Sequence, residues 1–334
     1  MNFSRHQERA ERIGRGLLWL YAIAVAAVVV AGNGAAALAW RLAWGGWFGY
    51  PDYFFLTNTL VLAGLILGGS WIETSRLRQG GHVIADQLGA TRADPGADLL
   101  ERRLVNIVEE MAIAARTAVP GVYLLRDEPS INALAAGVDR NDCVVIVTAG
   151  ALQRLDRAEL QGVIAHELSH IVNGDVQLNT RLVGLNYGLE LIGLLGRRLL
   201  GQPFRRSGAG RAAPLPPLVA IAAGAALIAI GALGTFAARV IKAAIGRQRE
   251  FYADAQAVEF TRQRDGLGRA LRKVAGLSGN DWRGASLRQP HWENVSHLLL
   301  VAPPPTLAWL ATHPPLRERL RRLYGRHVLS LIHI

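Results

Sequence analysis

Two long apolar runs near the N-terminus constrain the fold of this 334-residue chain more than any other feature. They cover residues 17–39 and 53–72, and neither contains a charged side chain. About 20 apolar residues, in a helix that rises 1.5 Å per residue, cross the roughly 30 Å hydrocarbon core of a bilayer. We therefore predict a transmembrane helical hairpin within residues 1–72. The second run argues against the alternative of a cleaved secretory signal peptide.

The residues that flank the two runs orient the hairpin. Arginines precede the first run and follow the second, whereas the connector between the runs contains only Arg41. Tryptophan and tyrosine side chains also gather in the connector, as they do at membrane–water interfaces. Because basic residues collect on the cytoplasmic side of a membrane, we expect both ends of the hairpin to lie in the cytoplasm.

The composition indicates a protein that is part membrane and part soluble domain. Charged residues make up 19% of the chain, whereas a soluble domain usually has about a quarter. The formal net charge of +11 fits arginine-rich membrane flanks, and no zinc-finger, KH or RRM pattern supports a nucleic-acid partner. The single cysteine, Cys143, excludes an intramolecular disulfide and a cysteine-based zinc ribbon.

The chain after the hairpin indicates an α+β fold that is mostly α. A helix-period apolar pattern covers residues 98–119 and ends at Pro120. Runs rich in β-branched residues predict strands at 122–125 and 143–148. A capping box then begins a helix that runs to about residue 173.

Two more apolar stretches, residues 182–195 and 218–238, are joined by a Gly/Pro/Arg linker over residues 201–217. The first stretch is short and contains Glu190, which is costly in lipid. If both stretches cross the membrane, the arginines of the linker lie outside, against the positive-inside rule. Either the first stretch does not cross fully or the N-terminal hairpin overrides that rule, and both alternatives stay open.

The decisive motif is His-Glu-Leu-Ser-His at residues 166–170. Residues four apart share one face of a helix, so His166 and His170 can take two tetrahedral positions around one Zn²⁺. Glu167 lies beside them, where it can take a proton from the water that attacks a peptide carbonyl. The simpler alternative is a pair of histidines that only pack on a helix face. The capped start and apolar setting of this helix favour the metal site.

A catalytic zinc site needs a third protein ligand. The later positions of an extended HExxHxxGxxH motif hold Asn173 and Val176, so that motif does not supply it. Glu250 and Asp254 lie four apart on one helical face, where Glu250 can bind zinc while Asp254 holds the far nitrogen of a ligand histidine. Two carboxylates at this spacing are more often a solvated face. The prediction therefore depends on their pairing with the histidine motif.

With this set of motifs, the chain resembles membrane-embedded zinc metallopeptidases of the HtpX and CAAX-prenyl-protease kind. The resemblance covers nearly the whole chain, from the hairpin through INALAAG, LQGVIAHELSHIVNGD, the two internal apolar stretches and RQREFYADAQAV to ATHPPLRERL. It implies a zincin-like domain of the gluzincin type, α+β and mostly α, with an N-terminal transmembrane hairpin and two further apolar helices inserted. The size and the hairpin fit the HtpX-like proteases better than the larger prenyl enzymes.

For the metal site, the resemblance implies that His166, His170 and Glu250 bind one Zn²⁺ per chain. It implies that Glu167 is the general base and that Asp254 holds a ligand histidine from behind.

For the substrate, the resemblance assigns Asn132 and Ala133 to the family's Asn-Ala segment, as contacts of the substrate strand. His313, in the His-Pro-Pro motif, would donate a hydrogen bond to the oxyanion, and Arg319 would orient it. A residue that only stabilises a turn is the alternative for His313.

The resemblance also implies an order of domains along the chain. A membrane hairpin comes first, the metallopeptidase domain follows in two parts, and the apolar helices are inserted between those parts. The corresponding ranges are 1–72 for the hairpin, 73–180 and 246–328 for the metallopeptidase, and 181–245 for the insert. Residues 329–334 resemble the translated end of a transposon used in DNA library preparation, and we expect no functional role for them.

The implied function is that of a membrane-anchored zinc endopeptidase in membrane protein quality control. Its partners would be misfolded membrane proteins and the lipid bilayer, at the bacterial inner membrane with the catalytic domain in the cytoplasm. The alternative is a non-catalytic, zinc-stabilised scaffold or chaperone. Glu167 argues against it, because a structural zinc site needs no base and usually has four protein ligands.

Overall fold

The computed structural model describes residues 3–44, 49–201, 217–278, 298–301, 311 and 313–325. The chain forms two compact units, each built from two segments. Unit 1 comprises Met1–Thr74 and Gly184–Ile241, and unit 2 comprises Ser75–Val183 and Lys242–Ile334. Most of the predicted linker at 201–217, and all of residues 329–334, lie outside the described residues.

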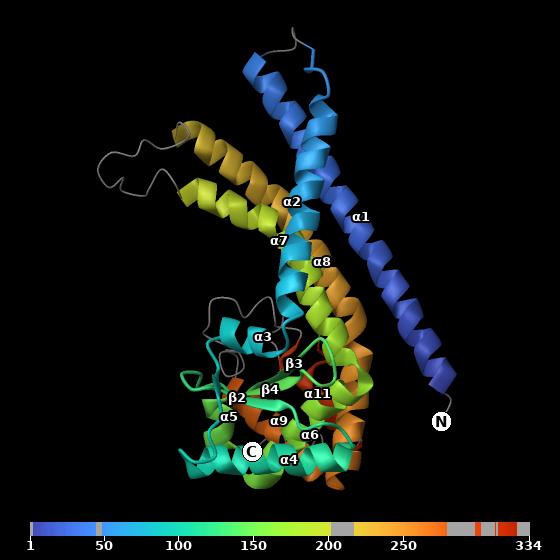
Figure 1. Cartoon of the computed structure of the whole chain (residues 1–334), viewed down its shortest axis with the longest axis vertical. Coiled ribbons are helices and arrows are strands. Elements are labelled where there is room, and N and C mark those ends of the chain that lie inside the picture. The colour runs from blue at the N-terminus through green and yellow to red at the C-terminus, as the bar shows by residue number, and fades with distance from the viewer. Residues whose placement is uncertain are drawn as a thin grey trace, which may run out of the picture. The chain divides into compact units, whose positions relative to one another are not determined.

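Unit 1 is helical among its described residues. It contains α1 (Phe3–Trp44), most of α2 (Phe54–Leu77), and parts of α7 (Asp175–Gly201) and α8 (Pro217–Thr261) (Figure 1). Three described segments are long and apolar enough to cross a membrane: Trp19–Leu42, Phe54–Leu77 and Ala220–Ile241. The two apolar helices predicted near the N-terminus are thereby confirmed, and the third segment coincides with the predicted stretch 218–238.

The helices of unit 1 pack through one apolar cluster that also encloses polar contacts. The Tyr21 hydroxyl lies 2.6 Å from Oγ of Ser70, and Ser70 donates a hydrogen bond of 2.8 Å to the carbonyl of Leu185. These groups find partners within the helix bundle, as a bilayer without water requires. The buried apolar members of the cluster come from all four helices: Tyr21, Ala24, Val28, Ile66, Leu189, Ile192 and Ile230.

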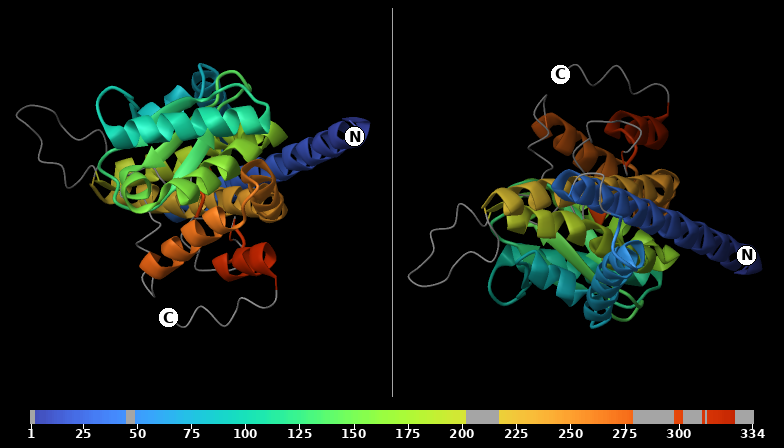
Figure 2. Two further views of the ribbon diagram at one scale, coloured as in Figure 1. Left: turned by 90° about the horizontal axis from the view of Figure 1, so that it is seen from below. Right: turned by 90° about the horizontal axis from the view of Figure 1, so that it is seen from above.

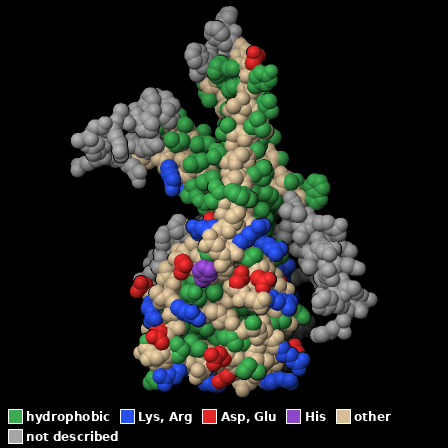
Figure 3. Space-filling view, viewed as in Figure 1, with side chains coloured by type: hydrophobic (Ala, Val, Ile, Leu, Met, Phe, Trp, Pro, Cys, Tyr) green, Lys and Arg blue, Asp and Glu red, His purple; other side chains and the backbone are tan. Residues whose placement is uncertain are grey.

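The outward face of unit 1 is apolar as well. Large side chains such as Trp19, Leu60 and Trp71 are exposed. In the space-filling view, hydrophobic side chains are spread over the visible face of these helices, whereas charged side chains are scattered over unit 2 (Figure 3). Exposed apolar surface of this extent suits lipid better than water.

Unit 2 is built on a four-stranded sheet with the strand order β1-β2-β4-β3. The β2–β4 pair is parallel, and the other two pairs are antiparallel. The strands are β1 (Thr91–Arg92), β2 (Gly121–Leu125), β3 (Ala133–Ala136) and β4 (Val144–Thr148).

Helices bury both faces of this sheet. Along β4, Val145 and Val147 join the cluster that includes α4, α6 and α9, whereas Val144 and Ile146 join a second cluster with α3. Alternate residues of a strand point to opposite faces, so a continuous β-branched run suits a strand covered on both sides. Figure 2 shows α9 and α11 side by side. The helices of this unit are α3 (His82–Gln87), α4 (Leu99–Ala115), α5 (Ala149–Arg154), α6 (Arg157–Asn173), α9 (Asp265–Ser278) and α11 (Leu316–Tyr324), together with the ends of α7 and α8.

The mostly helical α+β fold is as predicted, and both predicted strands and the capped helix are confirmed. The helix predicted over 98–119 ends earlier, because Arg116 adopts the left-handed conformation with φ of 54°. The stretch 218–238 and the helical pattern after it form one continuous helix, α8, since no proline interrupts them.

Glycines allow α7 to approach its neighbours closely in unit 1. A Cβ at Gly231 of α8 would overlap the backbone of Gly193 on α7, and a Cβ at Gly188 would overlap the backbone of Ile66 on α2. Helices in membranes associate through such small residues, because close approach increases van der Waals contact.

We therefore expect Gly231→Ala to destabilise the protein by about 1–3 kcal/mol, because the backbone of Gly193 cannot move aside for the new methyl group. Thermal or chemical unfolding in detergent measures the change. Gly64→Ala is the matched control, since a Cβ at Gly64 meets nothing within 4 Å. Equal stability of the two variants would contradict the close packing of α7 and α8.

Candidate metal centre

Helix α6 places two histidines one turn apart. Its start is fixed by a complete capping box, in which Asp156 accepts from the backbone of Glu159 and the Glu159 side chain accepts from the backbone of Asp156. Its end is fixed by Gly174, which adopts a left-handed φ of 77°. Within the helix, His166 is fully buried and His170 is largely buried.

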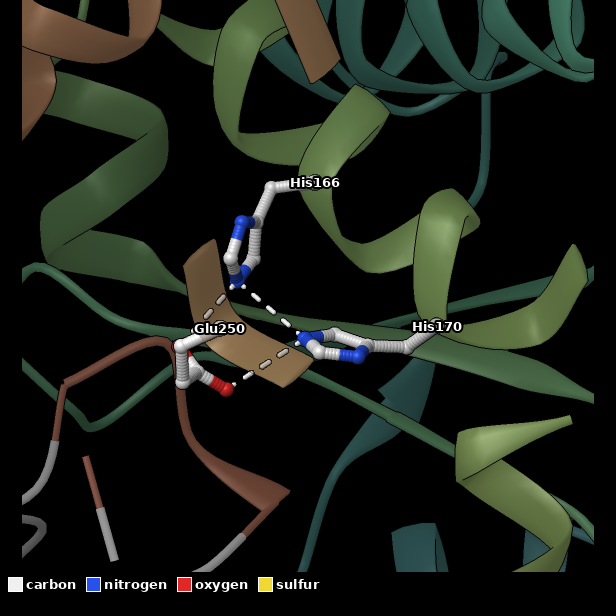
Figure 4. Close-up of side chains that lie close together, drawn as sticks. All are labelled: His166, His170 and Glu250. Atoms are coloured by element: carbon white, nitrogen blue, oxygen red, sulfur yellow. Dashed lines mark hydrogen bonds and ion pairs between the residues drawn. The ribbon is translucent and has the colours of Figure 1, made fainter. Parts of the chain in front are cut away.

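The carboxylate of Glu250, on α8, converges with these two imidazoles (Figure 4). The Nε2 atoms of His166 and His170 lie 3.2 Å apart. One Glu250 oxygen lies 3.5 Å from Nε2 of His166, and the other lies 3.5 Å from Nε2 of His170. Two imidazoles and one carboxylate, from two helices distant in sequence, therefore face one point.

This arrangement fits a zinc ion. Zinc binds imidazole nitrogen and carboxylate oxygen at about 2.0–2.2 Å in tetrahedral sites, so two neighbouring ligand atoms stand about 3.3–3.5 Å apart. The separation of the two Nε2 atoms agrees with that edge length, and each imidazole also has one of the two Glu250 oxygens 3.5 Å from its Nε2. Three protein ligands leave a fourth position, as in catalytic rather than structural zinc sites.

Asp254 and Arg319 lie behind His166. Oδ1 of Asp254 lies 3.1 Å from Nδ1 of His166, on the side of the ring opposite the metal-facing nitrogen. Arg319 donates to both oxygens of Asp254, from Nε at 2.9 Å and from Nη2 at 2.7 Å. All three side chains are buried, so the arginine supplies the positive charge that a buried carboxylate requires.

Asp175 and Arg249 lie behind His170 in the same way. Nδ1 of His170 lies 3.1 Å from Oδ2 of Asp175, and Nη1 of Arg249 lies 2.8 Å from Oδ1 of Asp175. Burial alone would lower the pKa of His170, but the contacts with Asp175 and Glu250 raise it to about 10. Metal binding at Nε2 therefore has to displace a proton from this ring.

The carboxylates of Glu250 and Asp254 remain ionised. Burial would raise the pKa of Glu250, but His313 and the two histidines of α6 hold it well below its usual value. Burial would likewise raise the pKa of Asp254, which Arg319 and His166 lower to about 2. Both carboxylates thus carry their negative charge at neutral pH.

Glu167 differs from these two carboxylates. It is only 1% exposed, and its Oε1 has no hydrogen-bond partner among the described residues. Burial raises the pKa of its carboxyl group above the ordinary value. A carboxylate oxygen without a partner, next to the two candidate ligand histidines, is available to a water molecule or a substrate, as a general base has to be.

His313 and Arg319 both lie in the cluster. Nδ1 of His313 lies 3.2 Å from Oε2 of Glu250. Besides Asp254, Arg319 contacts Oε2 of Glu250 at 3.3 Å and donates to the carbonyl of Leu300 at 2.8 Å. Through these contacts Arg319 supports the two carboxylates, and its predicted orientation of His313 stays a prediction.

Asn132 and Ala133 lie at the start of β3, where both are 1% exposed. Their polar groups bind another part of the same chain. Asn132 donates to the carbonyl of Val301 at 2.8 Å, and the amide of Leu300 donates to the carbonyl of Ala133 at 2.8 Å. Residues 298–301 therefore cover this edge of β3, and the predicted contact with a substrate strand stays a prediction.

The residues predicted from the sequence to form the metal site lie together in the structure. Asp175 and Arg249, which lie behind His170, were not predicted. Each had a local signal. Asp175 directly follows the glycine that ends α6, and Arg249 directly precedes the predicted ligand Glu250. The predicted pair Glu250 and Asp254 does not lie on a solvated face, since both are buried.

Comparison with known proteins identifies the family. The model of Peptidase family M48 matches residues 98–327 of the chain. A "Protease HtpX homolog" from Dictyoglomus turgidum is 39% identical over 226 residues, which are 66% of this chain and 68% of the relative. Another, from Caldanaerobacter subterraneus subsp. tengcongensis, is 35% identical over 274 residues, 80% of this chain and 84% of the relative. The chain belongs to peptidase family M48, a family of metallopeptidases.

A solved structure is also similar. The crystal structure of S. mikatae Ste24p matches with a TM-score of 0.41 and 19% sequence identity. The match covers 89% of this chain and 66% of that chain.

We expect Arg319→Met to lower the free energy of unfolding by about 3–5 kcal/mol, because it leaves the Asp254 carboxylate buried without its partner. Chemical denaturation in detergent measures this change. The matched control on the same helix is Arg321→Met, which removes only an exposed contact of 3.7 Å to Glu318 and should change stability far less. Similar losses in the two variants would contradict the supporting role of Arg319.

Proposed function

We propose that this chain is a membrane-anchored zinc endopeptidase that holds one Zn²⁺ per chain through His166, His170 and Glu250. The observation that carries the proposal is the convergence of two imidazole nitrogens, 3.2 Å apart, with the Glu250 carboxylate, which places one oxygen 3.5 Å from each nitrogen. Beside them, Oε1 of Glu167 has no hydrogen-bond partner among the described residues. A bound zinc ion would polarise the peptide carbonyl and lower the pKa of the attacking water, so that a base can remove its proton.

The residues of the chain would then move the proton and stabilise the developing charge. Glu167 takes the proton from the attacking water and delivers it to the nitrogen of the leaving amine. His313, beside Glu250, donates a hydrogen bond to the oxyanion that forms on the substrate carbonyl. No covalent bond to the protein forms during the reaction.

The proposal includes the place of the chain in the cell. Residues 1–72 anchor the chain, residues 73–180 and 246–328 form the metallopeptidase domain, and residues 181–245 contribute the inserted apolar helices. Arginines at both ends of the hairpin support a catalytic domain that faces the cytoplasm of a bacterial inner membrane. Misfolded membrane proteins are the substrates that such a location would supply.

We expect Glu167→Gln to keep zinc but to lose cleavage by at least about 100-fold, because the amide cannot accept the proton. The detergent-purified chain is prepared with chelator to prevent self-cleavage and then mixed with zinc and an unfolded model protein. The proposal is supported if the parent cleaves the model protein only when zinc is added and the variant does not cleave it. Stoichiometric zinc without cleavage by either protein would favour a zinc-stabilised scaffold instead.

Glu250→Ala should lower the zinc content of the purified protein, because it removes one of three ligands. Elemental analysis after dialysis measures the metal per chain. Glu259→Ala is the matched control, since Glu259 lies on the same helix but is exposed. Unchanged zinc in Glu250→Ala would remove this residue from the ligand set.

A further inference from the structure

The helix that carries His170 is followed directly by a turn at a glycine. Helix α6 ends at Asn173, Gly174 adopts a left-handed φ of 77°, and Asp175 is the first residue of α7. Residues other than glycine rarely adopt this conformation. After this turn, the carboxylate of Asp175 lies 3.1 Å from Nδ1 of His170.

Asp175 uses its two oxygens for two different partners. Oδ2 meets His170, and Oδ1 meets Nη1 of Arg249 at 2.8 Å. Arg249 and Glu250 are neighbours on α8, so this helix acts on the His170 ring from both sides. Glu250 faces Nε2 directly, whereas Arg249 acts on Nδ1 through Asp175.

This contact differs from the one behind His166 in its exposure to solvent. The side chains of Asp175 and Arg249 are 10% and 21% exposed, whereas those of Asp254 and Arg319 are 5% and 0% exposed. Loss of a sealed partner leaves a buried charge and threatens the fold. Loss of a partner that solvent reaches leaves a charge that water can hydrate, so the fold tolerates it better.

We propose that Asp175 and Arg249 are positioning residues that set the zinc affinity of the site by fixing the ring of His170. The Asp175 carboxylate accepts a hydrogen bond from Nδ1–H of His170, which leaves the lone pair of Nε2 for the metal, and Arg249 fixes the position of the Asp175 carboxylate. This inference rests on the proposed function. A purely structural ion pair between α7 and α8 would instead change stability and leave zinc affinity unaltered.

The test measures zinc affinity in the full chain in detergent by competition with a chromophoric chelator, without reference to cleavage. We expect Asp175→Asn to bind zinc about 10–100-fold more weakly than the parent, because partners of ligand histidines typically contribute this much. Arg249→Gln should shift the affinity in the same direction. Since Arg249 acts through Asp175, the double variant should bind zinc no more weakly than Asp175→Asn alone.

Arg157→Gln is the matched control, because Arg157 also forms an ion pair, with Glu110. Among the described contacts, Arg157 has none with His166 or His170. Its zinc affinity should equal that of the parent. If Asp175→Asn does not fold, Arg249→Gln alone decides the question by the same measurement.

The outcomes separate this inference from the proposed function. Tight zinc binding by the parent with equally tight binding by both single variants would overturn the inference and leave the proposed function standing. A parent that binds no zinc would overturn both. Weaker zinc binding by the single variants, without a further loss in the double variant, would support a relay from Arg249 through Asp175 to His170.

Discussion

The burial of three carboxylates around two imidazoles is the constraint on which the rest of the structure depends. Glu167, Glu250 and Asp254 are each at most 5% exposed, and removing such a group from water costs on the order of several kcal/mol. Among the described residues, Arg319 is a fully buried cation, and it contacts the carboxylates of Glu250 and Asp254. A divalent metal ion together with Arg319 would supply three positive charges, which equals the total negative charge of the three carboxylates. The proposed zinc would take the place of the positive charge that the protonated His170 ring supplies before metal binds.

The fold of unit 2 serves to hold this cluster. The sheet is covered on both faces, and the apolar face of α6 packs into the cluster that β4, α4 and α9 share. Glu250 and Asp254 come from α8, and Arg319 comes from α11, so elements far apart in sequence must meet before the charges are balanced. Arg319 also donates to the carbonyl of Leu300, which ties the segment beside β3 to the same cluster. The site is therefore complete only in the folded domain.

Local sequence predicted the parts of the fold that local interactions determine. The capping box, Gly174 and the spacing of His166 and His170 act within a few residues, and the structure has the predicted helix. Strand β3 was not predicted, because its alanines have little preference for strands. Among the described residues, its pairing is with β4 and, through a single bridge, with Leu299, both of which are distant contacts. Asp175 and Arg249 were missed for a related reason. An ion pair between two helices leaves no periodic pattern in either one.

The central claim is that one metal ion lies between two helices of unit 2, held by two imidazoles and a carboxylate. Anomalous diffraction at the zinc edge, from crystals of the zinc-loaded chain, tests it most directly. We predict one anomalous peak per chain, within bonding distance of Nε2 of His166, Nε2 of His170 and the Glu250 carboxylate. Zinc bound at another place, or at this place without Glu250 among its ligands, would contradict the proposed zinc site.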